Sequence, residues 1–156
     1  MRVIVAICSI FVLSAVGAGA DTSLQEIVGS WNGSTRIIVI WCDQSELTIA
    51  VNIYPNGSVT GRIGDADLLS GKLVRNGWLT RILGSRNDWI IEGSLSGSIV
   101  EDEGIARKSV KIPLRLANGE LHGGLHTSGW TFGGRQSGAL STSHMVLRQP
   151  ASEREM

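Results

Sequence analysis

The sequence predicts an all-β protein: an antiparallel up-and-down (meander) β-barrel of about eight strands, preceded by a short helical turn. Apolar and polar residues alternate with a period of two along most of the chain, and a helical period is almost absent. Asn-Gly dipeptides separate these runs, and they favour tight hairpin turns between neighbouring antiparallel strands. Glycines also recur on the apolar face of several strands, which suits a tightly curved wall better than a flat sheet.

The first twenty residues (1–20) are expected to be an export signal that is removed from the mature chain. Arg2 is the positive start, residues 3–16 are the apolar stretch, and Ala18-Gly19-Ala20 is a small-residue cleavage site. The apolar stretch is shorter than the roughly 20 residues of a membrane-spanning helix. We therefore expect a secreted or periplasmic protein that begins at Asp21 and has no membrane span.

The remaining 136 residues suffice for one domain, predicted over residues 21–150, followed by a disordered tail at 151–156. Without Arg2, 13 Lys and Arg face 14 Asp and Glu, and no basic block stands out. This charge pattern argues against nucleic acid as a partner. Cys42 is then the single cysteine, and we expect a small buried side chain there rather than the link of a disulfide-bonded dimer.

The expected elements follow from the alternation and the turns. A helical turn is predicted over residues 23–28, before the first strand. The strands are predicted near residues 31–40, 46–54, 58–64, 69–76, 78–84, 89–100, 109–117, 120–127 and 137–148. A sandwich of two sheets remains the alternative to the closed barrel.

The glycine pattern favours the barrel over the sandwich. Gly57, Val59, Gly61 and Ile63 occupy alternate positions, so glycines share a face with apolar residues. In a flat sheet an inward glycine loses packing area, whereas in a small barrel it permits strong bending and relieves crowding inside. The same glycines could also leave room in the interior for a ligand.

Two short motifs resemble the calycin superfamily, the lipocalin and avidin-like barrels. Gly29-Ser30-Trp31 opens the first strand, and Arg148 lies near the end of the last, in "MVLRQ". The resemblance implies that Gly29 and Trp31 are structural residues at the closed end of the barrel. It also implies that Arg148 packs across the Trp31 ring in a cation–π contact. The central Trp-Lys stretch of the avidin-like proteins has no counterpart, so the resemblance does not imply biotin binding.

The candidate ligand site is the interior of the predicted barrel, which the inward residues of the strands and the tryptophans would line. Trp rings offer a large rigid face with a polar handle, which suits an apolar or ring-shaped ligand. His122 and His126 alternate with leucines and should point outward, too far apart to share a metal ion. We expect no metal, no cofactor and no catalytic residues. The expected ligand-binding residues are Ile49, Val51, Val59, Gly61, Leu121, Trp41, Trp78 and Trp130.

The function that these observations predict is that of an exported barrel that binds a small apolar or amphipathic molecule. The alternative is a secreted protein-binding module, such as an inhibitor or adhesion barrel, that presents loops or an outer face to another protein. Enzyme signatures are absent from the sequence: the Gly-x-Ser-x-Gly elbow, the phosphate loop and the His-Glu-x-x-His motif do not occur. A roomy interior would favour the carrier, and a filled interior with an apolar outer patch would favour the protein-binding module.

Overall fold

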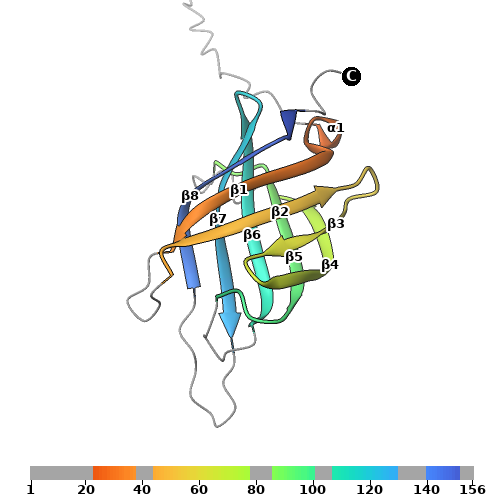
Figure 1. Ribbon diagram of the computed structural model, residues 1–156. Coiled ribbons are helices and arrows are strands. Elements are labelled where there is room, and N and C mark those ends of the chain that lie inside the picture. Colours follow the sequence, from red (N-terminus) through yellow and green to blue (C-terminus); the bar gives the residue numbers. More distant parts are fainter. Residues whose placement is uncertain (1–22, 38–43, 78–85, 101–106, 130–139, 152–156) are drawn as a thin grey trace, which may run out of the picture.

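A computed structural model describes residues 23–37, 44–77, 86–100, 107–129 and 140–151. Eight antiparallel strands form a closed barrel after one helical turn, which confirms the predicted fold class (Figure 1). The strands follow one another around the barrel in chain order, and β1 closes it by pairing with β8. The elements are α1 (Leu24–Ile27), β1 (Gly29–Ile37), β2 (Glu46–Ile53), β3 (Ser58–Ile63), β4 (Ala66–Arg75), β5 (Trp89–Ser96), β6 (Arg107–Ala117), β7 (Glu120–Gly129) and β8 (Leu140–Arg148).

Some strand limits differ from the prediction. β4 starts at Ala66 rather than at residue 69, directly after a tight turn in which Gly64 has φ +56°. β5 ends at Ser96 because Gly97, at φ +103°, leaves the extended conformation. The strand predicted at 78–84, the signal segment and residues 152–156 lie outside the described residues. No helix in the described ranges is long and apolar enough to cross a membrane.

The apolar residues of the alternating pattern face the inside of the barrel, and the polar residues face the outside. In β2 the apolar positions are buried and the intervening positions are exposed, in strict succession. The turns set the register: Asn118 and Gly119 have φ +55° and +75°, which is the backbone of a two-residue hairpin turn. The β2–β3 turn instead places Gly57 at φ +78°, and its N–H donates to the Tyr54 carbonyl. Asn56-Gly57 and Asn118-Gly119 thus join neighbouring antiparallel strands, as predicted.

Glycines lie where adjacent strands come too close for a side chain. A Cβ on Gly61 would stand 2.1 Å from the Ala50 carbonyl oxygen of β2. A Cβ on Gly123 would stand 2.0 Å from the Pro113 carbonyl oxygen of β6. The glycines therefore permit sharp curvature of the wall. At Gly61 the backbone of the neighbouring strand fills the space, so this glycine leaves no room for a ligand.

The short helical turn lies at one end of the barrel. Ile27 of α1 is completely buried, and its carbonyl accepts a hydrogen bond of 2.9 Å from Nε1 of Trp31. Gly29 links α1 to β1 with φ +133°, which an L side chain would strain. The turn between β6 and β7 and the end of β8 lie at this same end (Figure 1). We call it the α1 end.

The expected contact between Arg148 and Trp31 is wrong. Both residues lie at the α1 end, where Asn32 pairs with Arg148 across β1 and β8. Trp31 points into the barrel, whereas the Arg148 side chain is 66% exposed and forms an ion pair with Glu120 on the outer wall. Side chains alternate between the two faces of a strand, and Arg148 follows the inward Leu147. The guanidinium is therefore on the opposite side of the wall from the indole ring.

Candidate functional site

The interior of the barrel contains the described residues predicted to bind a ligand. Ile49, Val51, Val59 and Leu121 point inward and are at most 1% exposed. Trp41, Trp78 and Trp130 lie outside the described residues, as does Cys42. The inward side chains pack against one another as a hydrophobic core that extends from β1 to β8. Eight-stranded barrels are just wide enough for their own side chains or one small ligand.

Hydroxyl groups enter the interior near the end opposite α1. Thr35, Thr127 and Thr142 come from the adjacent strands β1, β7 and β8 and are 3–5% exposed. The Thr142 hydroxyl accepts a hydrogen bond of 3.1 Å from the backbone N–H of Leu125. The Thr142 hydroxyl therefore bonds β8 to β7 at the point where the regular pairing of these two strands is interrupted.

The apolar lining is less completely covered at the α1 end. Leu73, Trp89 and Leu116 come from the adjacent strands β4, β5 and β6, and we call them the rim cluster. Leu73 and Leu116 are only partly buried against the core, and Trp89 is 8% exposed. Leu24 of α1, also partly buried, lies at the same end. Here the continuous apolar interior meets the surface.

Trp89 gives the rim cluster its polar groups. It pairs with Leu114 on one side and with Arg75 on the other. The Arg75 guanidinium carbon lies 5.7 Å from the centroid of the Trp89 ring, within the range of a cation–π contact. In the described ranges, the buried Nε1–H of Trp89 has no hydrogen-bond acceptor. The rim therefore combines apolar surface, a positive charge and a buried donor.

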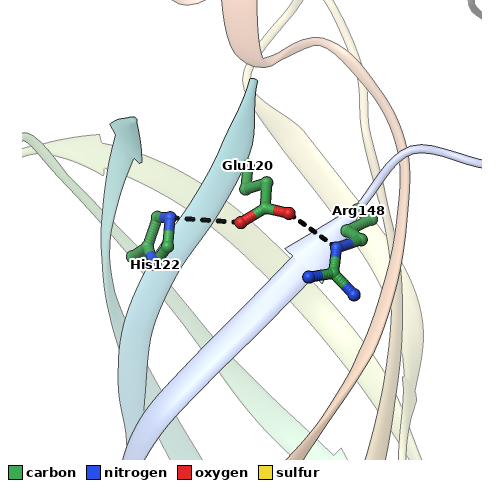
Figure 2. A network of polar contacts seen from close by, with 3 residues as sticks. All are labelled: Glu120, His122 and Arg148. Carbon is green, nitrogen blue, oxygen red and sulfur yellow. Dashed lines mark hydrogen bonds and ion pairs between the residues drawn. The ribbon is translucent and has the colours of Figure 1, made fainter. Parts of the chain in front are cut away.

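The outer wall near this end carries a small charged network. Glu120 lies between His122 and Arg148, and its two carboxylate oxygens face different partners (Figure 2). The Arg148 Nε is 2.6 Å from one oxygen, and the His122 Nε2 is 3.5 Å from the other. The three side chains are between 29% and 66% exposed, so solvent screens their interactions. This network ties β7 to β8.

A polar groove lies over β1, β2 and β8. Its volume is about 450 Å³. His144 enters it from an irregular stretch of β8 and has φ +62°, a conformation that L residues avoid. The Ser34 hydroxyl donates to the Glu46 carboxylate in the same groove. The groove is lined by Ser34, Thr35, Arg36, Ser45, Glu46 and His144.

The histidines of β7 point outward, as predicted. The His126 side chain is exposed and lies 3.1 Å from the Ser141 hydroxyl, while His122 joins the Glu120 network. Within the described part of the chain, no three His, Cys, Asp or Glu side chains gather in a way that could hold a metal ion.

No protein family, no curated protein and no solved structure matches the chain. The calycin resemblance therefore stays a prediction that the barrel fold neither supports nor opposes on its own.

The rim cluster and Arg75 were not predicted as site residues from the sequence. A usable signal exists: Leu73 and Arg75 are two apart and share one face of β4, and Arg75 directly precedes Asn76-Gly77. A cation on the inward face at the last position of a strand lies at the mouth of a barrel. Trp89 is the matching first residue of the next strand, which only the pairing of β4 with β5 reveals.

Proposed function

We propose that the chain is an exported protein that binds a small apolar or amphipathic molecule at the α1 end of the barrel. The observation that carries this proposal is the rim cluster. Leu73 and Leu116 remain partly exposed beside a continuous apolar interior, and Trp89 offers a rigid aromatic surface between them. A guest that covers these side chains removes apolar surface from water, which favours binding. Export and a secreted or periplasmic location belong to the same proposal, but the site lies at the end of the barrel that the calycin resemblance implies to be closed.

The interior deeper in the barrel sets a limit on this guest. The residues around Ile49 and Leu121 are already packed, so a guest sits at the rim and reaches inward only as far as side chains move aside. This favours a compact or narrow molecule over one that occupies the whole barrel.

Uptake of the fluorescent hydrocarbon diphenylhexatriene tests the proposal. The wild type should bind the probe, and its emission should rise on transfer from water. Leu116→Glu introduces a carboxylate among apolar groups and should weaken binding by about tenfold or more, or about 1.4 kcal/mol. Leu69→Glu is the matched control, because Leu69 is 48% exposed on the outer face of β4. Absence of uptake by the wild type, or equal losses in both variants, contradicts the proposal.

A second function, binding of another protein through the outer wall, is favoured by a different observation. Val74 pairs with Ile90, and Ile90 pairs with Pro113, so three apolar side chains lie in one row across β4, β5 and β6. Val74 is 43% exposed. A row of apolar side chains on the outer surface of a barrel with a packed interior is typical of a surface that binds another protein. If this function holds, Ile90→Lys removes a partner that co-purifies with the wild type and leaves diphenylhexatriene uptake unchanged.

A further inference from the structure

The two tryptophans in the described part of the chain use their N–H groups differently. Trp31 donates to the Ile27 carbonyl at 2.9 Å, so its polar group is satisfied by the fold. The N–H of Trp89 is buried as well, yet no acceptor among the described residues lies within hydrogen-bond distance. Buried donors are nearly always paired, because leaving one unpaired forfeits the hydrogen bond it makes with water. Trp89 therefore needs an explanation that packing alone does not give.

The neighbours of Trp89 show why they do not supply an acceptor for its N–H. An indole N–H only donates, and the guanidinium of Arg75 also has donors and no acceptor. Arg75 lies over the face of the ring, 5.7 Å from its centroid, whereas the N–H points outward in the plane of the ring. The paired residue on the other side, Leu114, is apolar and fully buried. An acceptor for this donor is thus best supplied by a guest bound at the α1 end.

We propose that the Trp89 N–H selects guests that carry an acceptor oxygen, such as a carbonyl, on an otherwise apolar body. This inference rests on the proposed binding function and adds which molecules the rim prefers. The apolar body covers Leu73 and Leu116, and the oxygen accepts the hydrogen bond from Trp89. Because the donor is shielded from water, the bond adds more affinity than an exposed one. A hydrocarbon of the same shape leaves the donor unpaired and binds less tightly.

A matched pair of probes tests this selection. The first is a propionyl-(dimethylamino)naphthalene, whose emission shifts to the red when its carbonyl accepts a hydrogen bond. The second is the propyl analogue, which has nearly the same shape and lacks the oxygen. The wild type should bind the carbonyl probe about tenfold more tightly, which corresponds to about 1.4 kcal/mol. The emission of the bound carbonyl probe should show the red shift of a hydrogen-bonded carbonyl.

Replacing the N–H without changing the ring provides the decisive variant. Trp89→β-(3-benzothienyl)alanine substitutes sulfur for N–H in a bicyclic side chain of almost the same size. It should abolish the preference between the probes and the red shift while the ligand-free protein keeps its melting temperature. The same replacement at Trp31 is the control: it removes a donor that the Ile27 carbonyl uses, so it should lower the melting temperature and leave the preference intact.

The outcomes separate this inference from the function on which it rests. If both probes bind equally to the wild type, or the preference survives the replacement at Trp89, the selection is wrong and the binding function stands. If the replacement at Trp89 lowers the melting temperature as much as that at Trp31, the donor already has a partner, such as a bound water, and the inference is wrong. If neither probe nor diphenylhexatriene binds, the proposed function itself is wrong.

Discussion

Gly123 allows a quantitative test of the close approach between strands. It pairs with Leu114 across β6 and β7, and a Cβ there would stand 2.0 Å from the Pro113 carbonyl oxygen. Real Cβ atoms essentially never approach closer than 3.0 Å, so Gly123→Ala must separate the two strands by about 1 Å. A backbone carbonyl within a strand cannot rotate away as a side chain can. We therefore expect the free energy of unfolding to fall by about 3 kcal/mol, the upper part of the range for overpacking.

Urea unfolding followed by tryptophan fluorescence measures this loss. With a slope of about 1.5–2 kcal/mol per molar urea, the midpoint should fall by about 1.5–2 M. Gly77→Ala is the control, because nothing lies within 4 Å of its added Cβ. That change should leave stability unaltered or raise it by up to about 1 kcal/mol, since it restricts the unfolded chain. Equal midpoints for the two variants would refute the argument that close strand contacts require these glycines.

Three other substitutions probe the contact between β1 and the helical turn, the end of β8 and the irregular middle of β8. Trp31→Ala should lower the free energy of unfolding by about 3–5 kcal/mol in thermal denaturation, because it removes a large buried ring and its bond to Ile27. A loss under about 1 kcal/mol would contradict the structural role of Trp31. Arg148→Ala should cost less than about 1 kcal/mol, and the difference should vanish in molar salt, because the ion pair with Glu120 is exposed. A larger loss of stability that does not depend on salt would contradict this and would support a contact between Arg148 and the Trp31 ring. His144→Gly should raise stability by about 1 kcal/mol in urea unfolding, because glycine adopts φ +62° without strain; a loss would show that the imidazole makes stabilising contacts.

The fold could be predicted from the sequence because its signals are local. The alternation over β2 has a period of two, and that period places Ile49 and Val51 on one face whatever their neighbours are. Asn118-Gly119 fixes the β6–β7 hairpin through its own backbone preference. The glycines on apolar faces indicated curvature because steric crowding between strands admits little else. Each of these properties depends on a few consecutive residues.

The candidate site could be predicted only in part, because it depends on residues far apart in the chain. The inward direction of Val59 and Leu121 followed from alternation, and the structure places both in the core. That Arg75 lies over Trp89 follows from the register between β4 and β5, which no local pattern specifies. The direction of Arg148 was misjudged because the resemblance to calycins outweighed the alternation with Leu147, which places Arg148 outside. Local periodicity was the better guide there.

Native mass spectrometry of the protein isolated from its own source is the sharpest test of guest binding at the rim cluster. We predict a folded chain that carries one small molecule, which is lost on extraction with organic solvent and which contains an apolar body with an acceptor oxygen. The extracted protein should then take up diphenylhexatriene, and the returned molecule should displace the probe. A bare chain that carries no small molecule and takes up no probe after extraction would contradict the claim.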